Sequence, residues 1–117
     1  MSLDYIRKMK RDAINKGNIL FVTLGQNGVL CTNNIEKIYH VALKDEYREM
    51  VNYSASSRTG STNGAGDVFA GAVLSLGALR KNADITKIAM RASKASIRHI
   101  GYEGPIEYSS FNIKFCK

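Results

Sequence analysis

The chain has few of the residues that build disulfide-bonded, zinc-binding or membrane-spanning proteins. Its 117 residues include two cysteines, one proline and no tryptophan. Cys31 and Cys116 lie far apart and form no CxxC or Cys/His cluster, so the sequence predicts neither a metal site nor a disulfide framework. No segment approaches the roughly 18 apolar residues of a membrane span, and the charged N-terminus does not resemble a signal peptide. We therefore expect a globular, cytoplasmic protein that does not engage a membrane.

Acidic residues are also scarce, because 10 Asp+Glu stand against 17 Lys+Arg and give a formal net charge of +7. Such a charge admits anionic partners without selecting one. Part of the excess lies in "RKMKR" (7–11). A second group follows a spacing of four, three and four residues, which lines one face of a helix: Lys87, Arg91, Lys94 and Arg98. The simplest interpretation is a solvated helix face, and it disfavours nucleic acid as a partner.

The pattern of apolar residues predicts a single α/β domain over residues 1–117. Helical spacing indicates an amphipathic helix at 3–16, and the nearly unbroken apolar run "NILFVTL" (18–24) is typical of a strand buried on both faces of a parallel sheet. We expect this strand to be central in the sheet. "GQNG" (25–28) is a turn, and Asn33-Asn34 indicates a hairpin.

The second half of the chain is predicted to be mainly helical. A short strand is expected at 50–53, a helix from about Ala65 to Arg80, and a second helix from Asp84, its N-cap, to Gly101. A turn at Gly104-Pro105 and a last strand at 111–115 complete the pattern.

The stretch "STNGAGD" (61–67) places small residues where the first of these helices must begin. Glycines allow a ligand to approach backbone N–H groups closely, and a helix N-terminus leaves about four such groups unpaired beside a partial positive charge. The segment therefore favours an anion site, with phosphate as a natural ligand. Asp67 would lie beside that phosphate and accept a proton from an attacking hydroxyl. The alternative, that Asp67 only stabilises the helix start while the glycines serve a turn, stays open on local chemistry.

Three segments, in order, resemble the ribokinase/PfkB family of sugar and nucleoside kinases. "STNGAGD" is similar to the family signature D-T-x-G-A-G-D, "FVTLGQNGVL" (21–30) to its strand and turn T-L-G-x-x-G, and "ASKASIRHIGYEGPI" (92–106) to its alanine-rich helix and Gly loop. The resemblance implies the C-terminal part of a ribokinase-like (Rossmann-like) three-layer α/β sandwich. It also implies an ATP- and Mg²⁺-dependent kinase that acts on a hydroxyl of a sugar or nucleoside.

The resemblance also implies roles for individual residues. Asp67 would be the catalytic base, and the backbone amides of Gly64, Ala65 and Gly66 would form the anion hole for the γ-phosphoryl group. The remaining implied contacts are with the nucleotide: Thr62 and Asn63 on the phosphate side, Thr23, Gly25 and Gly28 near the phosphates and ribose, Met90 near adenine, and Gly101 at the pocket boundary. A tight strand-to-strand turn is the structural alternative for Thr23, Gly25 and Gly28, and an ordinary core methionine is the alternative for Met90.

Two departures from the family limit what the resemblance implies. Ser61 stands where the family has an aspartate near its monovalent-cation site, which argues against potassium activation. The family's N-terminal Gly-Gly and Asn-x-x-Glu motifs are not found in the chain, so we expect a portion that is inactive alone and pairs with a missing N-terminal half or as a homodimer. A structural fragment or a basic nucleic-acid-binding module are the alternatives. His40 and His99 are expected to be structural or surface residues.

Overall fold

The computed structural model describes Asp4, Lys8 and residues 19–34, 37–56, 64–77 and 84–116. Most of the helix expected at 3–16 lies outside these residues, although Asp4 and Lys8 are helical. None of the described helices is long and apolar enough to cross a bilayer.

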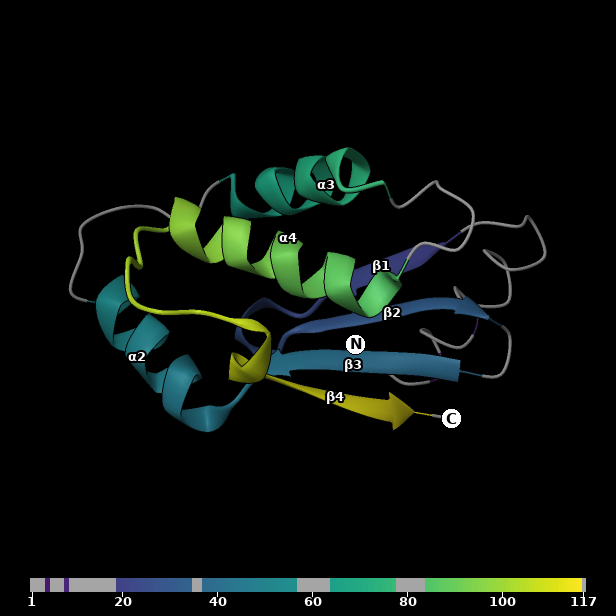
Figure 1. The fold of residues 1–117 in the computed structure, drawn as a ribbon, viewed down its shortest axis with the longest axis horizontal. Helices are drawn as coiled ribbons and strands as arrows, with labels where there is room; N and C mark the ends of the chain where they lie inside the picture. Colours follow the sequence, from purple (N-terminus) through teal and green to yellow (C-terminus); the bar gives the residue numbers. More distant parts are fainter. Residues whose placement is uncertain are drawn as a thin grey trace.

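Within the described residues, four strands form a single antiparallel sheet in the order in which they occur along the chain (Figure 1). These strands are β1 (Leu20–Thr23), β2 (Val29–Asn34), β3 (Lys37–Leu43) and β4 (Phe111–Cys116). The hairpin expected at Asn33-Asn34 is confirmed by the pairing of Asn34 with Lys37, and the last strand is also present.

The expectation that residues 18–24 form a central strand of a parallel sheet is wrong. β1 lies at an edge of the described sheet and runs antiparallel to β2, with Thr23 paired to Val29. Only the short 3-10 turn η1 (Gly25–Asn27) and Gly28 connect the two strands after Leu24. A connection this short permits antiparallel pairing alone, because a parallel pair needs a crossover of a dozen or more residues.

Gly28 closes this turn and brings it against the neighbouring strand. Its φ is +92°, and a Cβ atom there would overlap the carbonyl oxygen of Val41 and lie 2.9 Å from the Cα of Ala42. The Gly28 carbonyl accepts a 2.8 Å hydrogen bond from the backbone N–H of Leu24. Glycine is therefore required at this position both for the backbone conformation and for the close approach to β3.

Three helices complete the described part: α2 (Asp45–Ser56), α3 (Ala65–Ser75) and α4 (Ile85–His99). α3 begins where the sequence predicts but ends before Arg80, at Ser75, shortly before Gly77 with its φ of +86°. α4 begins after Asp84, whose carboxylate accepts a hydrogen bond from the Lys87 backbone N–H at 3.2 Å. The strand expected at 50–53 is wrong, because these residues belong to α2.

α3 and α4 lie side by side on one face of the sheet (Figure 1), with α4 in contact with β2 and β3. α3 reaches the sheet edge through an edge-on contact between Phe69 and Phe21 of β1, with ring centroids 6.3 Å apart. Together they bury a core in which Cys31, Ala89 and Ala92 are at most 1% exposed. The result is a small α/β structure. The end of β1, the turn η1 and the starts of β2 and α3 lie close together at one end of it.

Candidate functional site

The glycine-rich segment of the sequence becomes the first turn of α3. Gly64 is the N-cap residue, with a left-handed φ of +86°, and it offers no side chain to cap the helix. Its carbonyl accepts the first helical hydrogen bond, from Val68 N–H at 2.9 Å. The backbone N–H groups of the residues before Val68 have no acceptor within the helix, as at any helix start, so they are available to an external acceptor. An ideal Cβ atom on Gly66 would meet nothing within 4 Å, so the space beside this turn is open.

α4 holds this helix start in place. The Ser96 hydroxyl donates a hydrogen bond to the Ala65 carbonyl at 3.0 Å. The ring of His99, one turn further along α4, packs against Gly64: a Cβ atom on Gly64 would lie 3.2 Å from His99 Nε2. A side chain at position 64 would thus require both a strained backbone and a displaced histidine. The first turn of α3 is therefore positioned by tertiary contacts rather than by a capping side chain.

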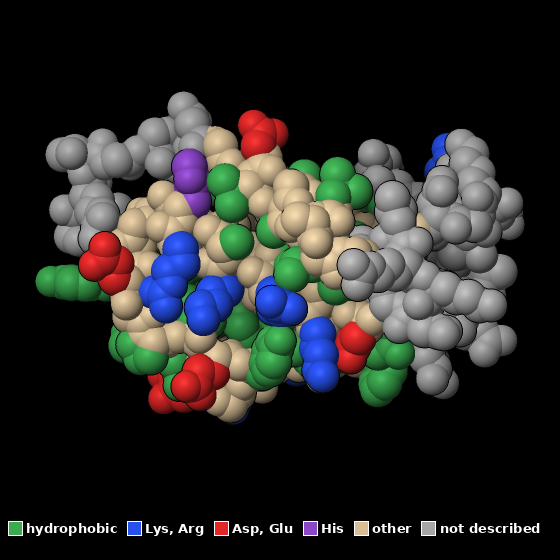
Figure 2. Space-filling view, turned by 45° about the horizontal axis from the view of Figure 1, so that its top comes forward, with side chains coloured by type: hydrophobic (Ala, Val, Ile, Leu, Met, Phe, Trp, Pro, Cys, Tyr) green, Lys and Arg blue, Asp and Glu red, His purple; other side chains and the backbone are tan. Residues whose placement is uncertain are grey.

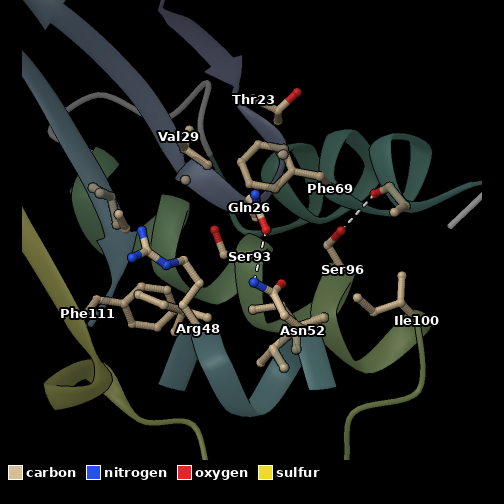
Figure 3. A pocket seen from close by; sticks show the side chains of 18 of the residues that line it. Thr23, Gln26, Val29, Arg48, Asn52, Phe69, Ser93, Ser96, Ile100 and Phe111 are labelled. Atoms are coloured by element: carbon tan, nitrogen blue, oxygen red, sulfur yellow. Dashed lines mark hydrogen bonds between the residues drawn. The ribbon is translucent and has the colours of Figure 1, made fainter. Parts of the chain in front are cut away.

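A cavity of about 390 Å³ opens beside the start of α3 (Figure 3). It brings together five residues predicted from the sequence, which come from two segments about 40 residues apart: Thr23, Gly25, Gly28, Ala65 and Gly66. Its walls are largely apolar, with Val29, Val51, Phe69 and Ile97 among them. This size and composition match those of small-molecule sites, which are mostly apolar with a few placed polar groups.

The polar groups of the cavity come mainly from residues that the sequence analysis did not assign. Asn52 of α2 donates a 2.9 Å hydrogen bond to the side-chain oxygen of Gln26 in η1, so the two amides face each other in the cavity (Figure 3). Arg48 also lines the cavity and pairs with Asp45 at 2.8 Å. Ser93 and Ser96 contribute hydroxyls from α4. The sequence could have indicated that these two serines act together, because Ser93 and Ser96 are three residues apart and therefore share one face of the helix.

Several predicted site residues lie outside this cavity lining. Gly64 and Asp67 lie directly before and after Ala65 and Gly66, which line the cavity. Asp67 is exposed in the first turn of α3. Gly101, with a φ of +102°, directly follows Ile100, which does line the cavity. Met90 is buried and lines a separate groove on another side of α4. Thr62 and Asn63, like Ser61, lie outside the described residues.

The two histidines both make contacts near turns. His40 Nε2 lies 2.6 Å from the Asn27 carbonyl oxygen, which ties β3 to the end of η1. His99 packs against Gly64 as described above. The part of the chain that the structure describes contains no group of three or more His, Cys, Asp or Glu side chains that would hold a metal ion.

A glycine-rich helix start that opens beside a largely apolar cavity is an arrangement typical of α/β domains that bind anionic ligands. The chain belongs to the pfkB family of carbohydrate kinases, since the model of the pfkB family carbohydrate kinase matches residues 3–110. This match confirms the resemblance drawn from the three sequence segments. Searches of the curated proteins and of the solved structures found no match.

Proposed function

We propose that this chain is the nucleotide-binding and catalytic part of an ATP-dependent kinase with a ribokinase-like fold. It would transfer the γ-phosphoryl group of ATP to a hydroxyl of a sugar or nucleoside. The observation that carries the proposal is the meeting of two glycine segments in one cavity, at a helix N-terminus whose first turn is open to a ligand. Membership of the pfkB family supplies the reaction class.

In this proposal the nucleoside part of ATP occupies the cavity and the phosphates extend toward the start of α3. Ile97 and Phe69 supply apolar surface for the base, while the Gln26–Asn52 amide pair and Ser93 supply polar contacts. Met90 faces a different groove, so we assign the apolar contact with the base to the cavity walls instead. Mg²⁺ would neutralise the charge on the phosphates and be held largely by them, as is common for this ion.

The transfer step uses the first turn of α3. The backbone N–H groups of Gly64, Ala65 and Gly66 donate to the oxygens of the transferring phosphoryl group, where negative charge is concentrated. Asp67 accepts the proton of the acceptor hydroxyl while the oxygen of that hydroxyl bonds to the γ-phosphorus. The bond from the γ-phosphorus to the β–γ bridging oxygen breaks, and ADP is released. The exposure of Asp67 leaves room for an acceptor in front of it.

The acceptor-binding groups are not identified among the described residues. We propose that they come from an N-terminal half or from a second copy of the chain, and that the isolated chain binds nucleotide without efficient transfer. The identity of the acceptor would then be set by that second part. Ser61, where the family has an aspartate, leads us to propose that potassium is not required.

The test is calorimetric titration with MgATP of two matched glycine variants. Gly66→Ala places a methyl group at the open side of the helix start, whereas Gly71→Ala places the same group later in α3; neither Cβ meets an atom within 4 Å. Both changes suit a helix, so neither should lower the melting temperature. We expect Gly66→Ala to weaken MgATP binding at least tenfold and Gly71→Ala to leave it unchanged. Equal affinities in the two variants, or no binding to the parent chain at millimolar nucleotide, would refute the site.

A further inference from the structure

A second feature of α4 is not used by the kinase site. Four cations follow one side of the helix over 12 residues, a rise of about 16 Å, and we call them the basic row: Lys87, Arg91, Lys94 and Arg98. Figure 2 shows basic side chains following one another across this face of the molecule. Lys87, Arg91 and Lys94 are exposed and Arg98 is partly exposed. The cavity beside the start of α3 is lined instead by Ser93, Ser96 and Ile97, which lie on another side of the same helix.

The structure adds a groove to the basic row. Arg91, Lys94 and Arg98 line a hollow of about 570 Å³ between α4 and the segment that leads into β4. Its apolar surface includes Met90 and Ile106, and Tyr108, which is 50% exposed, also lines it. A row of cations beside an apolar groove with an accessible aromatic ring is more than a solvated helix face. The sequence alone did not reveal this, because Tyr108 lies ten residues after Arg98.

The cations of the groove differ in how firmly they are held. Arg98 donates a 3.0 Å hydrogen bond to the Tyr102 carbonyl, and its guanidinium carbon lies 6.0 Å from the centre of the Tyr102 ring. Among the described residues, Arg91 and Lys94 have no acidic group within 4 Å, since the one ion pair found there joins Arg48 to Asp45. The groove therefore has a fixed arginine and two cations free to neutralise an anionic ligand. Among the described residues that line the groove, Glu107 carries the one acidic side chain.

We propose that the basic row and its groove bind single-stranded nucleic acid. The cations would contact successive phosphates along α4, and Tyr108 would stack on an unpaired base. Grooves that follow a phosphate backbone with cations and hold bases on aromatic rings are the general solution for single strands. A duplex would satisfy the row electrostatically but would keep its bases stacked internally, so the ring favours an unpaired strand over a duplex.

The test is fluorescence anisotropy with a labelled 12-nucleotide poly-uridine RNA and the corresponding thymidine DNA, titrated at several salt concentrations. Lys94→Gln should weaken binding and lower the slope of log K against log salt by about one, because one phosphate contact is lost. Lys114→Gln is the matched control, since it removes the same charge from an exposed residue of β4. Tyr108→Ala should weaken binding about fivefold or more and Tyr108→Phe should retain it, because the ring remains.

Four results would overturn the proposal: equal effects of Lys94→Gln and Lys114→Gln, equal binding of Tyr108→Ala and Tyr108→Phe, binding of heparin or duplex DNA as tight as that of the single strands, or competition by MgATP. The last result would place the oligonucleotide in the nucleotide cavity. Gly66→Ala should leave oligonucleotide binding unchanged, so this proposal and the kinase proposal fail or succeed separately.

Discussion

Asp67 is an exposed carboxylate in the first turn of α3, a position that suits both a catalytic base and a residue that stabilises the helix dipole. Asp67→Asn separates the two roles, because asparagine keeps the size of the side chain and is tolerated near helix starts. If Asp67 is the base, phosphoryl transfer should fall about 10²–10⁴-fold, while loss of the dipole contact costs only about 0.3–1 kcal/mol of stability. The measurement is the rate of phosphoryl transfer from ATP to an acceptor found in a panel of sugars and nucleosides. The chain is assayed together with the N-terminal half or second copy that supplies the acceptor-binding groups.

Nucleotide affinity and melting temperature are the controls for this substitution. MgATP binding by Asp67→Asn should stay within a few-fold of the parent, because the backbone amides that hold the phosphates are unchanged. A variant with an unchanged transfer rate but a lower melting temperature would assign Asp67 a structural role and leave the proposed mechanism without its base.

The family resemblance named several backbone positions that line the cavity but few of the polar side chains around it. Thr23, Gly25 and Gly28 line one cavity with Ala65 and Gly66, and their roles in nucleotide binding stay a prediction. Gln26 and Asn52 could not be paired in advance, because their 2.9 Å contact depends on how α2 packs over η1. The buried position of Met90 in a different groove likewise follows from the rotation of α4, which the sequence pattern does not specify to the nearest residue.

At the scale of elements, Asp84 sets the start of α4. Its carboxylate accepts hydrogen bonds from the Thr86 hydroxyl at 2.8 Å and the Lys87 backbone N–H at 3.2 Å, and these two contacts lower its pKa below the usual value of 3.8. Asp84→Ala should cost about 0.5–2 kcal/mol of the free energy of unfolding, as for other N-caps. Urea denaturation followed by circular dichroism measures this cost.

The pH dependence of that stability follows from the direction of the shift. A carboxyl group whose pKa is lower in the folded state contributes stability above its unfolded pKa and loses it as pH falls through the folded value. The contribution of Asp84 should therefore be complete near neutral pH and decline below about pH 4. Asp84→Asn keeps the cap without a titrating group, so its stability should fall less on acidification than that of the parent. Parallel acid profiles of parent and Asp84→Asn would contradict this account.

The elements that the sequence predicted poorly share a physical cause. An unbroken apolar run such as 18–24 indicates burial on both faces but carries no information on strand direction, which is set by the length of the connection to β2. Two short turns in succession, at 25–28 and at 33–34, were the signal for an antiparallel sheet. The sequence analysis did not predict α2, because the segment around Val51 has too few apolar residues to show a clear helical pattern. Asp45 and Glu46 in its first turn do favour a helix start.

The described elements share a single core around Cys31 of β2, which is 1% exposed and whose core cluster includes residues of α2, α3, α4 and β4. Burial, and to a smaller extent the negative charge of Asp84, raises the pKa of the Cys31 thiol to about 12. Both low exposure and low thiolate content should make Cys31 unreactive until the core opens, because the thiolate is the reacting species. Its modification therefore reports on the opening of the whole described structure.

In a Cys116→Ser variant, where Cys31 is the remaining thiol, iodoacetamide should react at least about 10³-fold more slowly than with the urea-unfolded chain, as expected for an unfolding free energy of 5 kcal/mol or more. The rate should rise with urea in parallel with the loss of the circular dichroism signal. MgATP at ten times its dissociation constant should slow the reaction a further tenfold or so, because a ligand of the folded state opposes opening by mass action. Rapid, urea-independent labelling would instead show that β2 opens locally. If MgATP binds but does not slow labelling, the opening that exposes Cys31 leaves the cavity beside α3 intact.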